Sequence, residues 1–354
     1  MATSPDRTRV RLTDISSRAY EHPADRGALT ALRSIKGFDE LVKRFFGMVN
    51  MRSLRLMHLA TAVRVDERQF PDVYDYVRDA AYTLDLAEVP ELYVRQDPKP
   101  NAMAIGYNKP FIVMTTGLFD LLDPEEQRFV VGHEVGHILS GHALYRTMLL
   151  WLINLASRIA WIPMGYIAIG AIIAALEEWH RKSELSCDRA GALACQDPEA
   201  AKRALMKIAG GSRLAEMNTD AMLEQAREYD AGGDALDSII KLLQVFGHSH
   251  PFAVVRLAEL NRWINEGEYQ RILDGQYPRR DTDSDASVGE EARNAANSYR
   301  ESWERSEDPL MGTIKDLAGS AADSGGKLFD NIAERWRGGT SGRDGESSSS
   351  GSSN

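Results

Sequence analysis

The run His133-Glu134-Val135-Gly136-His137 constrains this chain more than any other feature, because it has the spacing H-E-x-x-H. In an α-helix of 3.6 residues per turn, positions i and i+4 lie on one face, so both imidazoles can reach one ion. Glu134 follows His133 directly and can reach a water molecule at that ion. The motif therefore predicts a hydrolytic zinc site carried on a helix.

The residues before the motif have the pattern of a helix start. Asp123 provides an N-cap, Pro124 takes the first helical position and Glu126 stands at the third. We expect a helix from Pro124 to about Leu144. Its apolar residues should bury most of its surface and keep the site poor in water; they are Phe129, Val130, Val131, Ile138 and Leu139.

A catalytic zinc ion normally takes a third protein ligand. His142 is one candidate, and it would suggest the metzincin pattern. That pattern needs a glycine seven residues and a histidine ten residues after the first histidine, where this chain has Ser140 and Ala143. At about 100° per residue, His142 also lies about 180° around the helix from His133. We therefore expect His142 to cap or pack near the helix end.

Glu184 is the stronger candidate, on a second predicted helix over residues 181–191. Asp188 lies four residues later on the same face, where it can accept the outer N–H of a ligand histidine and fix its tautomer. The alternative is that both are solvated charges on a helix surface, like Glu177 and Glu178. Beside the H-E-x-x-H motif, we favour the metal-ligand interpretation.

Three elements of the chain resemble the M48 metallopeptidases, over about residues 90 to 260. They are H-E-x-x-H followed by R-x-x-E-x-x-x-D-x-x-G, a strand similar to N-A-F-A-x-G, and a late H-P-x-x-x-x-R element. Met103 replaces the usual Phe, and Cys187 stands where the family more often has Ala. The other matching residues are Arg181, Glu184, Asp188, Gly191, Asn101, Ala102, Ala104, Gly106, His250, Pro251 and Arg256.

The resemblance implies a gluzincin-type fold, mainly α with a small β-sheet (α+β), and a zinc-dependent endopeptidase acting on proteins or peptides. His133, His137 and Glu184 would hold one Zn²⁺ per chain, Asp188 would orient a ligand histidine, and Glu134 would transfer the proton. The alternative is a non-catalytic, chaperone-like or binding protein with a structural metal site. Glu134 favours the enzyme, because a structural site does not need it.

The tetrahedral oxyanion of peptide hydrolysis also needs a donor besides the metal ion. The resemblance points to His250 from the late element, His248 is its competitor, and a structural role is the alternative for either histidine.

Residues 91–95, 102–106 and 111–115 are rich in Val, Ile, Tyr and Phe and are separated by Pro and Gly, which predicts short strands. In zinc proteases of this type, an edge strand pairs with the extended substrate. The resemblance places that edge at 102–106, and ordinary sheet structure is the alternative. The expected substrate strand contains Asn101, Ala102, Met103 and Ala104.

Residues 148–176 form an apolar segment in which Arg158 is the only charge, and hydropathy alone makes it a membrane-span candidate. The metal ligands flank it, so the chain must cross a bilayer an even number of times for them to meet. Two crossings need about 40 residues. We expect instead a hairpin of two short helices turning near 163–165, either buried in the protein or in contact with one membrane leaflet.

The periodicity of apolar residues predicts an N-terminal helical region, 1–90, packed on a catalytic domain, 91–275. Residues 276–354 are largely polar and predict a disordered tail. Within it, 310–336 has near-helical apolar spacing interrupted at 324–326. This spacing indicates one or two short amphipathic helices able to bind a partner, the membrane surface or the catalytic domain, and a weakly ordered tail is the favoured alternative.

The net charge is −10, and no stripe rich in Lys and Arg offsets it in the sequence. This disfavours nucleic acid as a partner. Cys187 and Cys195 lie eight residues apart, about 12 Å along a helix and beyond disulfide reach, so we expect free thiols in a reducing compartment. Residues 1–13 are polar and predict no secretory signal. The expected location is the cytoplasm or the cytoplasmic face of a membrane, and the protein is not expected to be secreted.

Overall fold

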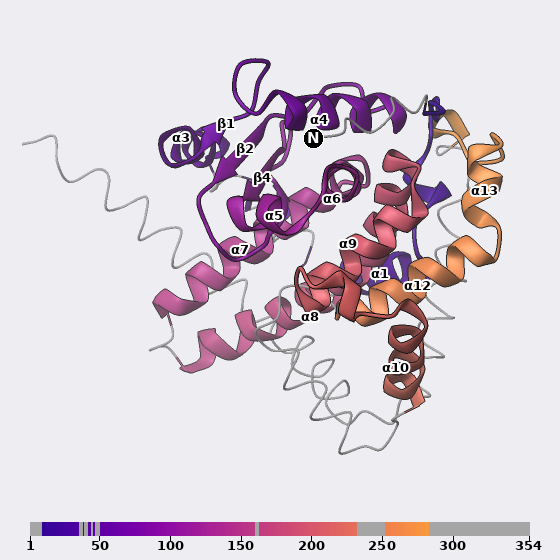
Figure 1. Ribbon diagram of the computed structural model, residues 1–354. Helices are drawn as coiled ribbons and strands as arrows, with labels where there is room; N and C mark the ends of the chain where they lie inside the picture. The colour runs from indigo at the N-terminus through magenta and orange to yellow at the C-terminus, as the bar shows by residue number, and fades with distance from the viewer. Residues whose placement is uncertain are drawn as a thin grey trace, which may run out of the picture.

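The structure is a computed structural model, and it describes residues 9–34, 38, 42–43, 45–46, 50–159, 163–231 and 252–282. Helices dominate it, and one small sheet lies toward one side of them, which confirms the predicted fold class (Figure 1). The helices are α1 (Pro23–Ser34), α3 (Met51–Thr61), α4 (Pro71–Thr83), α5 (Thr116–Leu121), α6 (Pro124–Leu139), α7 (His142–Ile159), α8 (Pro163–Cys195), α9 (Pro198–Gly210), α10 (Thr219–Ala231), α12 (Ala253–Asn265) and α13 (Glu268–Leu273). Short 3₁₀ turns occur at Ser17–Ala19, Leu214–Glu216 and Arg280–Thr282.

The sheet has four strands in the order β1-β2-β4-β3 and is mixed, because β2 and β4 are parallel while β1 and β3 pair antiparallel to their neighbours. The three predicted strands are present as β2 (Leu92–Arg95), β3 (Ala102–Ile105) and β4 (Phe111–Thr115). The short β1 (Val63–Arg64) was not predicted. In this order β3 is an edge strand, and α6 and α7 lie beside it.

Helix α6 begins as predicted, with a complete capping box between Asp123 and Glu126. It ends at Leu139, five residues earlier than we expected. Gly141 adopts a φ of 71°, which is left-handed and stops the helix, and α7 then begins at His142. His142 therefore lies on a different helix from His133, and the rotation expected between them does not apply.

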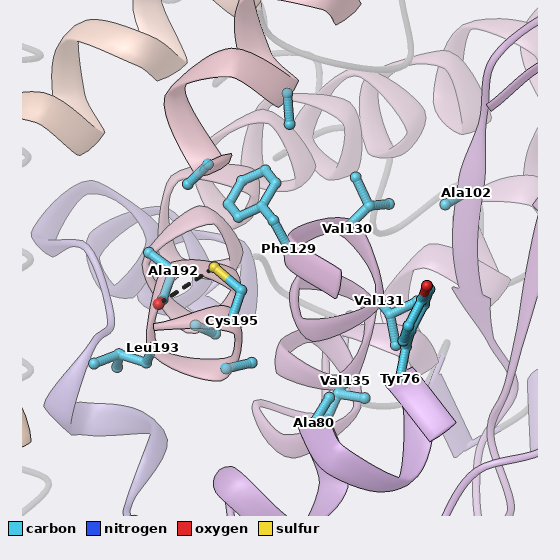
Figure 2. Close-up of a cluster of buried hydrophobic side chains, with 14 of the residues drawn as sticks. Tyr76, Ala80, Ala102, Phe129, Val130, Val131, Val135, Ala192, Leu193 and Cys195 are labelled. Carbon is cyan, nitrogen blue, oxygen red and sulfur yellow. Dashed lines mark hydrogen bonds between the residues drawn. The ribbon is translucent and has the colours of Figure 1, made fainter. Parts of the chain in front are cut away.

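Helices α6 and α8 pack closely because small residues meet at their contact. A Cβ atom added to Gly132 would lie 2.4 Å from that of Ala194, and one added to Gly136 would lie 2.5 Å from that of Ala190. Figure 2 shows the core beside this contact, with Phe129, Val130, Val131 and Val135 of α6 between residues of α4 and α8. The spacing between the two helices is therefore set by glycine backbone of α6 against alanine methyl groups of α8.

Helices α7 and α8 form the predicted hairpin, packed against α1 through a second core that includes Tyr145, Leu152 and Trp179. They are longer than the short helices we expected, with 18 and 33 residues. The turn expected at 163–165 is not there, because these residues form the first turn of α8, and residues 160–162 lie outside the described chain. In the described ranges, no helix combines the length and the apolar character needed to span a membrane.

The N-terminal region is helical as predicted, with α1 against α8 and α4 against α6. The domain boundaries near 90 and 275 stay predictions. The proposed amphipathic helix at 310–336 and most of the polar tail lie outside the described residues.

Candidate active site

Two helices bring the predicted metal ligands together. Helix α6 contributes His133 and His137, and α8 contributes Glu184; all three are buried. The Nε2 atoms of the two histidines are 3.2 Å apart. Oε1 of Glu184 lies 3.1 Å from Nε2 of His137, and its Oε2 lies 3.5 Å from Nε2 of His133.

These residues fit a zinc ion. Tetrahedral zinc bonded to nitrogen and oxygen at about 2.0 to 2.2 Å places neighbouring ligand atoms about 3.3 Å apart. The two Nε2 atoms are 3.2 Å apart, and each lies near a different oxygen of Glu184, at 3.1 Å from Oε1 and 3.5 Å from Oε2, which is close to that value. Two imidazoles and one carboxylate are also the donor set of many catalytic zinc sites.

Asp188 and Arg256 form a second group of polar contacts around the predicted metal ligands. Oδ1 of Asp188 lies 3.0 Å from Nδ1 of His133, which leaves Nε2 of that ring for a metal ion. Arg256 on α12 donates from Nε to Oδ2 of Asp188 at 2.8 Å, and its Nη1 lies 3.2 Å from Oε2 of Glu184. Burial raises the pKa of Asp188, but Arg256 and His133 outweigh it and the pKa is lowered. Asp188 is therefore ionised, and Arg256 compensates two buried carboxylates.

We identified Arg256 in the sequence only as part of a motif, and its partners are 68 and 72 residues away along the chain. A buried arginine is normally paired with a carboxylate, but the position of Arg256 in the sequence does not identify which carboxylate.

Glu134 is buried beside these ligands. In the described part of the chain, its Oε2 atom has no hydrogen-bond partner. Nη1 of Arg146, on α7, is 3.7 Å from that atom, and Nη2 donates to the carbonyl oxygen of Ala102 at 3.4 Å. Arg146 thus connects the carboxylate of the H-E-x-x-H motif to the edge strand. Sequence reasoning did not assign it a role; the available signal was a charge within an otherwise apolar stretch of α7.

His142 is buried next to a second polar group. Its Nε2 atom lies 3.3 Å from Oδ2 of Asp25, and its Nδ1 lies 3.5 Å from Sγ of Cys187. Burial lowers the pKa of His142 to about 4, so the ring is neutral at pH 7. Cys187 and Cys195 are free and buried, as expected.

The remaining predicted site residues fall in two places. Asn101 precedes β3, while Ala102, Met103 and Ala104 lie within it. His250 and its competitor His248 lie in 232–251, outside the described residues, so the oxyanion donor stays a prediction.

Comparison with known proteins identifies a family and a curated relative. The profile of Peptidase family M48 matches residues 67–264. The chain is 38% identical over 271 residues to "Plastoglobule-localized metallopeptidase 48, chloroplastic" of Arabidopsis thaliana, a match that covers 73% of this chain and 76% of that protein. No solved structure matches the chain significantly.

The predicted location was wrong. We expected the cytoplasm or the cytoplasmic face of a membrane, whereas the matched relative is localised to plastoglobules of the chloroplast. The expectation relied on free thiols and polar first residues. Free thiols indicate a reducing environment and do not distinguish one such compartment from another.

Proposed function

The chain belongs to peptidase family M48, and on that premise we propose that it is an endopeptidase in which His133, His137 and Glu184 hold one zinc ion per chain. The convergence of these three buried side chains at tetrahedral-ligand separations is the observation that supports the assignment. Its substrates are proteins or peptides, as for a peptidase of this family.

Each surrounding residue has a distinct part in the proposed reaction. A bound zinc ion supplies Lewis acidity. Glu134, with an unpartnered buried oxygen in the described structure, takes the proton of the attacking water and returns it to the leaving amine. Asp188 keeps the proton of His133 on Nδ1, and Arg256 keeps Asp188 in place. His250 is the proposed oxyanion donor, from the late motif.

We propose that the substrate lies along the outer edge of β3. The carbonyl of Asn101 accepts a hydrogen bond from the Thr115 amide of β4, so by alternation the backbone groups of Ala102 and Ala104 face away from β4. Both residues are buried at this outer edge, at 7% and 0% exposed. Arg146 contacts the Ala102 carbonyl and lies near Glu134, so this edge leads to the proposed base. An extended peptide paired here would pass the metal ligands.

Scanning a cleavable peptide with N-methyl groups tests this pairing without altering the protein. Methylation of an amide that donates to Ala102 or Ala104 should lower kcat/KM by about 3- to 10-fold, the value of one hydrogen bond. Methylation of the intervening amides should have a smaller effect, because they point away from β3. An effect that does not alternate along the peptide would contradict edge-strand binding.

We also propose that 148–176 contacts a membrane surface. Leu150 and Ile153 lie three residues apart on α7 and are 38% and 41% exposed. The full chain should float with lipid vesicles, and the double change Leu150→Ser, Ile153→Ser should lower its partitioning about tenfold. Met57→Ser, at an exposed methionine of α3, is the matched control. A wild-type chain that stays with the soluble fraction would contradict this contact.

A further inference from the structure

A second group of metal-binding side chains lies beside the zinc ligands. His142 at the start of α7 and Cys187 on α8 approach His137 of α6, and one donor atom from each lies within 4.8 Å of the others. All three residues are at most 2% exposed. The proposed peptidase chemistry uses neither His142 nor Cys187.

The distances in this group match those of ligands around an ion. Tetrahedral zinc with bonds of about 2.3 Å to sulfur and about 2.0 to 2.1 Å to nitrogen separates the two ligand atoms by about 3.5 Å. Sγ of Cys187 and Nδ1 of His142 are 3.5 Å apart.

His142 also lies beside a carboxylate, as ligand histidines commonly do. Metal-binding histidines commonly donate their second ring N–H to a carboxylate. Nε2 of His142 lies 3.3 Å from Oδ2 of Asp25, and Ser186 donates to the same oxygen at 2.6 Å. This arrangement leaves Nδ1 of His142 for Cys187 or for an ion.

His137 provides an independent observation. Its Nδ1 atom is buried and has no hydrogen-bond partner among the described residues. A buried ring nitrogen without a partner is costly unless something binds to it.

We propose that His137, His142 and Cys187 form a second site, for a thiophilic metal ion such as Cd²⁺, Cu⁺ or excess Zn²⁺. Thiolate ligands favour such ions. Binding breaks the S–H bond of Cys187, forms a sulfur–metal bond and releases the proton to solvent. His137 belongs to both groups of ligands. An ion at the second site therefore changes how His137 binds the first ion, and this change inhibits the peptidase. The site itself does not depend on the proposed peptidase activity.

Titration of the metal-stripped full chain with Cd²⁺ tests the site, because a cadmium–thiolate bond gives an ultraviolet charge-transfer band. We expect the band in the wild type and in Cys195→Ser, and its loss in Cys187→Ser. Cys195 is a matched control: it is equally buried on the same helix, and its Sγ contacts the backbone oxygens of Ala192 and Asp197. A band that persists in Cys187→Ser, or that is absent from the wild type, overturns the proposal.

The role of His142 needs a variant that keeps all three ligands. Asp25→Asn should weaken Cd²⁺ binding by about 10- to 100-fold while the band itself remains. Thermal unfolding of the metal-free proteins verifies that each variant folds. Unchanged Cd²⁺ affinity in a folded Asp25→Asn variant would rule out His142 as an oriented ligand.

Discussion

Glu134→Gln should lower kcat for peptide cleavage by about 10²- to 10⁴-fold, the usual contribution of a general base and acid. Glutamine keeps the shape of the side chain and cannot take a proton from water. Glu134 is not among the residues that converge as zinc ligands, so zinc content should stay at the wild-type level. Peptide hydrolysis measured together with metal content by mass spectrometry separates the two effects.

Glu177→Gln is the matched control for this variant. It makes the same chemical change on α8, seven residues before Glu184, and should retain most of the activity. The pair also separates an enzyme from a chaperone-like protein with a structural metal site. A Glu134→Gln variant that works as well as the wild type would favour the chaperone-like protein.

Glu184→Ala should release zinc, from about one ion per chain to little after dialysis. The substitution leaves only two of the three converging ligands and removes one of the two carboxylates that Arg256 contacts. Two imidazoles alone make a weaker and more open site than the usual three ligands. Metal content after gel filtration measures the loss, and retained zinc would refute the ligand assignment.

Two further variants make the zinc measurement specific. Asp188→Asn should weaken zinc binding by about 10- to 100-fold, because Asp188 contacts Nδ1 of His133 and orients that ring. Glu178→Ala removes a carboxylate from the same helix that pairs with Arg181 and Lys182, and should keep full zinc content. If both variants lost zinc equally, the effect would come from α8 as a whole.

Local patterns predicted the parts of the fold that depend on neighbouring residues. The capping box of α6 and the three short strands follow from residues close together in the chain. The helical hairpin was predicted instead from the positions of the expected metal ligands on either side of it. The end of α6 was missed because the apolar pattern continues through the break at Gly141 into α7. The pattern reports burial, and the residues on both sides of the break, including Val135, His137 and Ala143, are buried.

The contacts missed in the sequence span long distances along the chain. Asp25 meets Ser186 across 161 residues, and Arg146 meets Ala102 across 44. Neither pair lies in a motif with a fixed spacing. The first pair is visible only from the packing of α1 against α8, and the second only from the packing of α7 against β3. The convergence of His133, His137 and Glu184 was predictable, even though His137 and Glu184 are 47 residues apart. The H-E-x-x-H motif and the later E-x-x-x-D spacing are each recognisable in the sequence.

Helix α8 is continuous over 33 residues, about 50 Å of rod, and Glu184 lies about 32 Å from its first residue, Pro163. The far end of the hairpin and the Glu184 carboxylate therefore belong to one continuous helix. A tilt applied at Pro163 reaches Glu184 without a loop to absorb it. A surface or partner that moves the Pro163 end of the hairpin therefore also moves Glu184 relative to His133 and His137.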